Sequence, residues 1–316
     1  MIARLRQLRR NLLGINRRNH DLLFGFNARQ RYRVADDKCA TKTLLARHGI
    51  PTPVLHATCT GHWDVERIGG VLRSLPACVL KPARGAGGAG IVVLTAHMGE
   101  AFVTASGHHR PWADLATHIT DVLGGVYAGS GLGDALLVEA LVRSEATLAA
   151  LAHQGVPDVR VLVFRGVPLL AMLRLPTRSS DGRANLHLGG VGVGVDLASG
   201  YTTTAIRHGR RVTAHPDRGH ALAGIRIPAW ETILLLAVQA ADAAGLGFVG
   251  VDIVVDADHG PLVLELNARP GLGIQAANAT GLRPLVDAVA TRTVPPEPAA
   301  RVRLGQHLQA TNRSGT

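Results

Sequence analysis

The stretch GLGFVGVDIVVDADHGPLVLELNARPGLGIQAAN, residues 245–278, decides the fold because it contains two apolar runs that carry acidic residues. The runs at 248–256 and 261–267 consist largely of Val, Ile and Leu, and the intervening DADHG is typical of a tight turn. This pattern predicts a β-hairpin. Side chains alternate between the two faces of a strand, so Glu265 and Asn267, two residues apart, must point to the same face.

A metal site is one interpretation of this hairpin. If the strands pair so that Asp252 lies opposite Glu265, two carboxylates and the amide oxygen of Asn267 converge on one face. An all-oxygen set of this kind suits a hard cation such as magnesium. The other interpretation is a solvated face, which is common in antiparallel sheets. The hairpin alone leaves both open, although a carboxylate buried within an apolar strand needs a partner.

The composition is that of a globular protein with two packed lobes or one large domain. The chain has 316 residues and a mass of 33.2 kDa, and 47 % of its residues are apolar. Aromatic residues make up only 3 %, so stacking platforms for single-stranded nucleic acid are scarce. No apolar run reaches the length of a membrane span, and no secretory signal is evident. The three cysteines lack metal-ligand spacing, and we expect a cytoplasmic protein with neither a membrane nor nucleic acid as its partner.

The charge of the chain points to anionic ligands. The formal net charge of +11 favours acidic partners such as nucleotides, acidic peptides or nucleic acid. Arginine supplies most of it, because the only lysines are Lys38, Lys42 and Lys81. In a chain where nearly every basic residue is arginine, a lysine suggests that its position needs a compact ammonium group and not a planar guanidinium group. Residues 1–33 carry nine arginines against the single acid Asp21, which indicates either an arm for an anionic partner or an amphipathic helix packed on the body.

A glycine-rich segment follows Lys81. The strand predicted at 77–81 leads into PARGAGGAG, residues 82–90, and a second strand is predicted at 91–95. The glycines allow the backbone to approach a ligand closely, and successive exposed amides suit phosphate oxygens. No Gly-Lys-Ser/Thr follows, which excludes a Walker loop, and the strand–loop–strand order excludes the dinucleotide fingerprint. Lys81 at the start of this weak motif strengthens the phosphate-binding hypothesis.

Three further segments place polar residues in apolar or glycine-rich surroundings. Residues 135–142 predict a buried strand interrupted by Glu139, which either contacts a ligand or marks the end of the strand. Residues 158–175 predict a second hairpin. Its polar insertions are Asp158, Arg160 and Arg174. The loop at 177–190 is rich in hydrogen-bond donors, and it is either a ligand-binding loop or a mobile polar one.

Taken together, these motifs resemble the ATP-grasp ligases. The similarity rests on the order DDKCATKTLLARHGIPTP, VLKPARGAGGAGIVVL, LLVEAL, and VDIVVD with LVLELNARPGLG. The segment PDVRVLVFRGVPLLAMLRLPTRSSDGRANLHLGG resembles most the α-L-glutamate ligase-like proteins related to RimK. The resemblance runs from NRRNHD to about Leu282. It implies an α+β fold with two lobes of mostly antiparallel sheet and helices, and a nucleotide bound between the lobes.

The resemblance also implies roles for individual residues. The metal ligands would be Asp252, Glu265 and Asn267, holding one or two Mg²⁺ ions, or Mn²⁺ in their place, against the phosphates of ATP. The nucleotide contacts would be Lys38, Lys81, Gly85, Gly87, Gly88 and Glu139. The residues facing the transferring phosphoryl group or the acyl substrate would be Arg160, Arg174 and Asn185.

The activity implied is that of an ATP-dependent carboxylate–amine ligase. A carboxylate attacks the γ-phosphate to give an acylphosphate, and an amine then displaces phosphate to form an amide. Glutamate or another amino acid, joined to a peptide or a small molecule, is the substrate class that the resemblance suggests. Such a reaction asks mainly for charge neutralisation and alignment, which arginines, lysines and metal ions supply. The alternative is a non-catalytic ATP- or polyanion-binding module that uses the Arg-rich N-terminus.

The expected organisation has three parts. Residues 1–35 would be a basic N-terminal arm or the remnant of the lobe that precedes the ATP-grasp lobes in glutamate ligases. Residues 36–292 would be the ATP-grasp domain, with a nucleotide lid at about 50–135 and a C-terminal subdomain at about 136–292. Residues 293–316, rich in Pro, Arg and polar residues, would be a flexible tail. Because the preceding lobe is so short, we expect a partner protein or a second copy to complete the acceptor side.

Overall fold

The computed structural model describes residues 11–85, 87–99, 101–128 and 133–314, and divides the chain into two compact units. The larger unit contains residues 1–36, 40–52 and 143–316, and the smaller unit contains residues 37–39 and 53–142. The boundary lies after Val142 and not near residue 135, because strand β6 (Leu136–Ala140) pairs with strands of the smaller unit. No helix among the described residues is long and apolar enough to cross a membrane.

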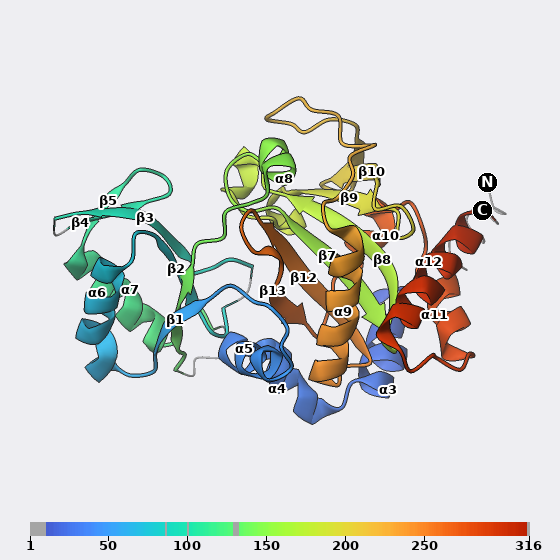
Figure 1. Cartoon of the computed structure of the whole chain (residues 1–316), viewed down its shortest axis with the longest axis horizontal. Helices are drawn as coiled ribbons and strands as arrows, with labels where there is room; N and C mark the ends of the chain where they lie inside the picture. The colour runs from blue at the N-terminus through green and yellow to red at the C-terminus, as the bar shows by residue number, and fades with distance from the viewer. Residues whose placement is uncertain (1–10, 86, 100, 129–132, 315–316) are drawn as a thin grey trace. The chain divides into compact units, whose positions relative to one another are not determined.

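The smaller unit is an antiparallel sheet with two helices on one face (Figure 1). Its strand order is β1-β6-β2-β3-β4-β5. The strands other than β6 are β1 (Leu55–Cys59), β2 (Cys78–Pro82), β3 (Val92–Met98), β4 (Ala101–Thr104) and β5 (His109–Pro111). The helical segments are η3 (His62–Asp64), α6 (Val65–Ser74) and α7 (Trp112–Leu123). Apolar residues on α6 and α7 share one hydrophobic core with the strands, so the sheet and its helices pack as a single unit.

The larger unit is built on a seven-stranded antiparallel sheet with the order β11-β10-β9-β8-β7-β12-β13. The strands are β7 (Asp158–Phe164), β8 (Val167–Leu175), β9 (Val191–Val195), β10 (Thr202–Arg207), β11 (Arg210–Val212), β12 (Phe248–Asp256) and β13 (Gly260–Asn267). Helix α9 (Trp230–Ala244) packs on one face (Figure 1). Helices α10 (Gly273–Ala277) and α11 (Arg283–Ala290) contribute to the core on the other face. Because both faces are covered, β7, β9 and β12 are buried along their whole length.

The alternation of side chains along β7 decides which face carries the polar residues. Val159, Val161 and Val163 contribute to the core that contains α9. Leu162 and Phe164 contribute to the core on the opposite face. Polar residues of β7 at even-numbered positions therefore share the face of Leu162 and Phe164.

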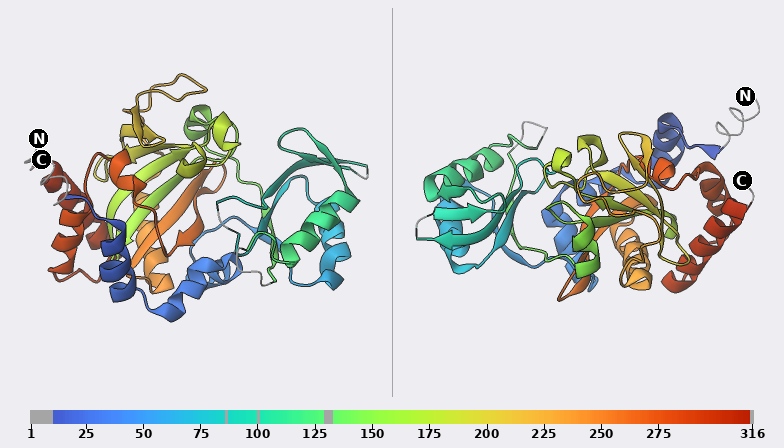
Figure 2. Two further views of the ribbon diagram at one scale, coloured as in Figure 1. Left: turned by 180° about the vertical axis from the view of Figure 1, so that it is seen from behind. Right: turned by 90° about the horizontal axis from the view of Figure 1, so that it is seen from above.

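The N-terminal residues that the structure describes pack against the larger unit. Their helical segments are α2 (Ile15–Arg17), η1 (Arg18–Leu23), α3 (Phe24–Phe26), η2 (Arg29–Arg31), α4 (Tyr32–Asp36) and α5 (Lys38–Arg47). Leu13, Leu22 and Leu23 are buried in the core beside Phe164. Figure 2 shows this segment next to α11, and Arg17 Nη2 lies 2.8 Å from Asp287 Oδ1. From residue 11 onward the segment is thus packed on the body, while residues 1–10 lie outside the described residues.

The expected flexible tail at 293–316 is not what the structure shows. Residues Pro298–Ser314 form helix α12, which contacts β8 and α9. Val302 and Leu308 are buried, and Arg301 Nη1 donates to Asp242 Oδ1 at 2.7 Å. The expectation was wrong because a few apolar residues are enough to hold a polar helix against a sheet that supplies the rest of the contact.

Candidate functional site

The acidic hairpin forms with the register that its sequence predicts. Strands β12 and β13 pair antiparallel, and Asp252 lies opposite Glu265 while Gly250 lies opposite Asn267. Directly opposed residues of an antiparallel pair share a face, so both carboxylates and the amide lie on the same side of the sheet. A bulge follows Asp252 and shifts the register toward Val263. The predicted hairpin and its facing acids are confirmed.

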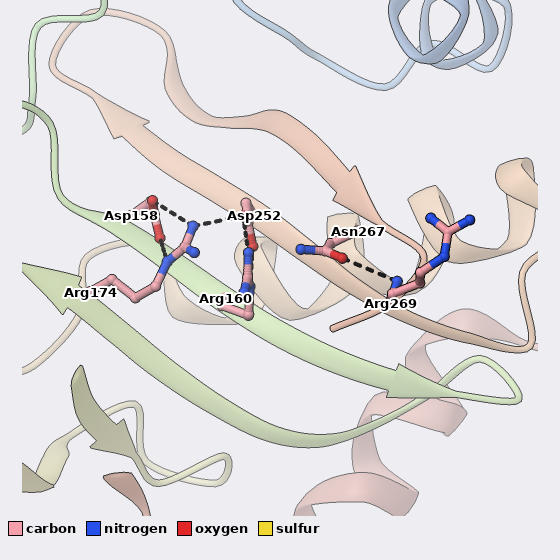
Figure 3. A network of polar contacts seen from close by, with 6 residues as sticks. All are labelled: Asp158, Arg160, Arg174, Asp252, Asn267 and Arg269. Carbon is pink, nitrogen blue, oxygen red and sulfur yellow. Dashed lines mark hydrogen bonds and ion pairs between the residues drawn. The ribbon is translucent and has the colours of Figure 1, made fainter. Parts of the chain in front are cut away.

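Arginines from the next two strands complete a four-residue network around Asp252 (Figure 3). Arg160 on β7 lies opposite Asp252, and its Nε and Nη2 donate to the two carboxylate oxygens at 2.7 and 2.6 Å. Arg174 on β8 donates from Nη2 to Asp252 Oδ2 at 2.6 Å. It also donates from Nε and Nη2 to the oxygens of Asp158 at 2.5 and 2.7 Å. Direct hydrogen bonds therefore link two carboxylates and two guanidinium groups in alternating order, Asp158–Arg174–Asp252–Arg160.

Burial makes the electrostatics of this network strong. Asp252 is fully buried, and only 4 % of Asp158 and 8 % of Arg160 are exposed. Burial by itself would raise the pKa of Asp252, but the guanidinium groups of Arg160 and Arg174 lower it below its usual range. Burial raises the pKa of Asp158 to about 6, with Arg174 opposing the shift. Asp252 is therefore the ionised anchor of the network, and Asp158 is its first acid to take up a proton.

The oxygen donors of the hairpin fit a hard cation such as Mg²⁺. Glu265 and Asn267 are partly exposed on the face of Asp252, and Asn267 Oδ1 accepts a hydrogen bond from the Arg269 backbone at 3.1 Å. Asp252 already accepts three hydrogen bonds from guanidinium groups, out of about four that a carboxylate can accept. Asp252 is buried among these contacts, whereas Glu265 and Asn267 are the partly exposed oxygen donors of the hairpin.

The predicted nucleotide contacts form two pairs within the smaller unit. Lys81 Nζ on β2 donates to Glu139 Oε2 on β6 at 2.7 Å, and only 2 % of the Glu139 side chain is exposed. Lys38 Nζ donates to Gly85 O at 2.6 Å, so this lysine holds the start of the glycine segment. Gly87 and Gly88 have φ values of 65° and 81°, which glycine adopts without strain. A phosphate contact at these groups stays a prediction.

Asn185 is not part of the arginine–aspartate network. It begins the short helix η5 (Leu186–Leu188), and its Oδ1 accepts a hydrogen bond from the backbone of His187 at 2.9 Å. The loop that carries it is ordered by η4 (Arg178–Ser180), where the side chains of Thr177 and Ser180 cap the turn reciprocally. The role that the resemblance implies for Asn185 stays a prediction.

Sequence reasoning gave no role to Asp158, although it noticed the residue. Asp158 and Arg160 are two apart on one strand and therefore share a face, which is the signal that would have placed Asp158 in the site. A second acidic group, Asp256 with Asp258 and His259, lies at the hairpin turn. There Asp256 Oδ1 accepts hydrogen bonds from the backbone N–H groups of the other two residues, so its carboxylate stabilises the turn.

Two units of antiparallel sheet with helices are the architecture of an ATP-grasp fold. The pyruvate carboxylase of Rhizobium etli has a similar fold over 86 % of this chain and 19 % of its own, with a TM-score of 0.51 and 16 % sequence identity. A family model described as "Sugar-transfer associated ATP-grasp" matches residues 17–291. The chain belongs to this family, and the expected ATP-grasp resemblance is confirmed.

Curated relatives carry the name that the sequence motifs suggested. A "Probable alpha-L-glutamate ligase" of Aeromonas salmonicida is 27 % identical over 248 residues, which are 77 % of this chain and 59 % of the relative. A protein of the same name from Sodalis glossinidius is 29 % identical over 248 residues, or 77 % and 60 % of the two chains. The chain thus spans about three-fifths of the length of the curated relatives that it matches.

Proposed function

We propose that this protein is an ATP-dependent ligase that joins a carboxylate to an amine. The observation that carries the proposal is the register that sets Asp252 opposite Glu265, beside Arg160 and Arg174, on one face of the sheet. Membership of the ATP-grasp family and the names of the curated relatives support it.

The proposed reaction has two balanced steps. An oxygen of the substrate carboxylate attacks the γ-phosphorus of ATP, the bond between that phosphorus and the bridging oxygen breaks, and ADP leaves. The amine nitrogen then attacks the acyl carbon of the acylphosphate, phosphate leaves with the bonding electrons, and the nitrogen loses a proton to solvent. Arg160 and Arg174 supply fixed positive charge near the acidic hairpin, where negative charge on the transferring phosphoryl group must be stabilised.

The remaining predicted residues would hold the nucleotide and its metal. Lys38, Lys81 and the glycine segment would bind the phosphates, since ammonium groups and backbone amides suit phosphate oxygens. Glu139, which fixes the Lys81 ammonium group at 2.7 Å, would set the position of that charge or contact the nucleotide. Mg²⁺ held by Asp252, Glu265 and Asn267, as one ion or two, would neutralise phosphate charge when bound, and Mn²⁺ would be a substitute.

The substrate class follows the relatives. We propose glutamate or another amino acid as one substrate, and a peptide or a small molecule as the other, on the strength of the name that the curated relatives carry.

The test is substrate-dependent release of ADP and phosphate. The full chain is incubated with ATP, Mg²⁺ and a panel of amino acids and peptides, and any product is identified by mass spectrometry. Glu265→Gln should abolish turnover, because it removes an accessible carboxylate from the hairpin face. Asp258→Asn at the exposed turn of the same hairpin is the matched control and should retain turnover.

A negative result has a defined form. If the chain binds ATP but no carboxylate in a broad panel stimulates ADP release, the ligase proposal fails. Steeply salt-dependent binding of nucleic acid, lost when residues 1–33 are deleted, would instead support the polyanion-binding module.

A further inference from the structure

Arg18 contacts the loop that follows the acidic hairpin. Its Nη1 donates to the carbonyl oxygen of Pro270 at 2.9 Å. Its Nε and Nη2 donate to Asn19 Oδ1 at 3.0 and 2.7 Å. Both acceptors are neutral, and no carboxylate of the described residues forms an ion pair with Arg18. The guanidinium group is thus fixed in place while its charge is left without a counter-charge.

The neighbouring residue Arg17 has the opposite surroundings. Its Nε lies 3.0 Å from Asp21 Oδ2, and its Nη2 lies 2.8 Å from Asp287 Oδ1. Two adjacent arginines therefore differ in their partners: two carboxylates neutralise Arg17, whereas within the described part of the chain the acceptors of Arg18 are neutral oxygens.

A second arginine, Arg269, precedes the Pro270 whose carbonyl oxygen accepts the Arg18 hydrogen bond. Burial lowers the pKa of Arg18, and the positive charge of Arg269 lowers it further. Arg269 is held in place by Asp36, at 2.8 Å from Oδ1, and by the ring of Tyr32, whose centroid lies 4.6 Å from its guanidinium carbon. Asp36 compensates one of the two guanidinium charges, so Arg18, Arg269 and Asp36 together carry one net positive charge, which an anion beside them would balance.

The loop that Arg18 contacts also touches residues of the candidate site. Arg269 donates its backbone N–H to Asn267, one of the predicted metal ligands. Pro270, whose carbonyl Arg18 holds, covers Gly250: a Cβ atom built on this glycine would lie 3.1 Å from Pro270 Cβ and 3.6 Å from Arg160 Nε. One loop therefore connects Arg18 to both the acidic hairpin and the arginine network.

We propose that Arg18, with Arg269 beside it, binds an anionic group of a substrate, either a carboxylate or a phosphate. That the bound anion belongs to a substrate rests on the proposed ligase function, whereas anion binding at Arg18 does not require catalysis. The fork of a guanidinium group suits both kinds of anion. The substrate that enters next to this loop would therefore carry a negative group besides the atoms that react.

Equilibrium binding tests the anion site without turnover. The full chain is titrated calorimetrically with glutarate, with inorganic phosphate and with the uncharged diamide of glutarate. At least one of the two anions should bind, and the diamide should not; the anion that binds identifies the group. Arg18→Gln should weaken that binding by roughly tenfold to a hundredfold, since hydrogen bonds to charged groups are about that strong. Arg18→Lys should fall between wild type and Arg18→Gln because it keeps the charge and loses the fork.

The matched control is Arg17→Gln, which removes a neighbouring arginine of equal charge and should leave anion binding at the wild-type level. Thermal unfolding of each variant shows whether it is folded. The anion site is overturned if neither anion binds to the wild-type chain, or if a folded Arg18→Gln variant binds as tightly as wild type.

The turnover assay separates this result from the ligase proposal. For a substrate that carries the anionic group, Arg18→Gln should raise KM by the same factor and leave kcat little changed. Arg18-dependent anion binding in a chain without ligase activity would uphold the site and refute the function. Ligase activity with a wild-type KM in Arg18→Gln would uphold the function and refute the site.

Discussion

Arg160 and Asp252 face each other across the pairing of β7 with β12, and two parallel hydrogen bonds of 2.7 and 2.6 Å join them. The residues are 92 positions apart in sequence, yet the register makes them direct neighbours. Their charges compensate in a buried setting, where an ion pair adds little over an apolar pair but the loss of one partner is costly. The pair therefore couples the stability of the larger unit to the electrostatics of the site.

Replacement of Asp252 by Asn tests this coupling. Asn keeps the shape but removes the charge that neutralises Arg160 and part of Arg174, so we expect a loss of about 3–5 kcal/mol in the free energy of unfolding. The negative charge of Asp252 also helps to raise the pKa of Asp158, which should fall in the variant. Urea denaturation at neutral pH measures the first effect, and titration of the Asp158 carboxyl resonance by NMR measures the second.

Asp258→Asn is the control for this substitution. Asp258 forms its ion pair with Arg143 at the exposed turn of the same hairpin, where solvent screens the interaction. Its removal should change stability little. A folded Asp252→Asn variant as stable as Asp258→Asn would contradict the idea that Asp252 anchors the network.

The sequence predicts the hairpin well and the arginine network poorly, for a physical reason. Two-residue alternation and turn chemistry are local signals, and they placed Glu265 and Asn267 on one face correctly. The contact of Arg160 with Asp252 depends on which strands become neighbours in the sheet, and periodicity carries no information on that order. Arg18 could not be singled out from the sequence, because it differs from Arg17 only in having no ion pair with a carboxylate of the described residues, and ion pairs are visible only in the structure.

Substitutions in the Lys81–Glu139 pair can distinguish a role in stability from a role in nucleotide binding. Lys81→Met removes the ammonium group from a nearly buried carboxylate, so we expect a loss of about 3–5 kcal/mol in stability. Adding Glu139→Gln removes the buried charge and should restore much of that loss. If Lys81 binds phosphate as proposed, ATP affinity measured by calorimetry should stay low in both variants, because both lack its ammonium group. Recovery of affinity in the double variant would show that Lys81 acts only through the fold.

His215 should make stability fall as the pH is lowered. Its Nε2–H donates to Pro176 O at 3.0 Å and its Nδ1 accepts from the backbone of Asp217 at 3.3 Å, so the neutral ring satisfies both contacts. Burial lowers the pKa of His215 below its ordinary 6.5, with the Pro176 contact opposing the shift. The unfolded chain therefore binds the proton first, and the contribution of His215 is complete above pH 6.5 and declines below it.

The free energy of unfolding, measured in urea between pH 5 and pH 8, checks this sign. His215→Gln should be less stable than wild type at pH 8, and the difference should narrow as the pH falls. The same substitution at the exposed His187 is the control and should leave the wild-type pH dependence in place. A constant difference between His215→Gln and wild type over this range would show that the neutral ring is not what the fold requires.

Gly305 tests whether α12 is an integral part of the larger unit. A Cβ atom at this position would lie 2.1 Å from the carbonyl oxygen of Pro168 at the start of β8, so the helix would have to move away from the sheet. Alanine improves helix propensity by about 1 kcal/mol, yet overpacking against backbone costs about 1–3 kcal/mol, and we expect a net loss of stability. Gly25→Ala in α3, where a Cβ atom meets open space, should instead be neutral or stabilising. Equal unfolding midpoints for Gly305→Ala and Gly25→Ala would mean that α12 does not pack on β8 as described.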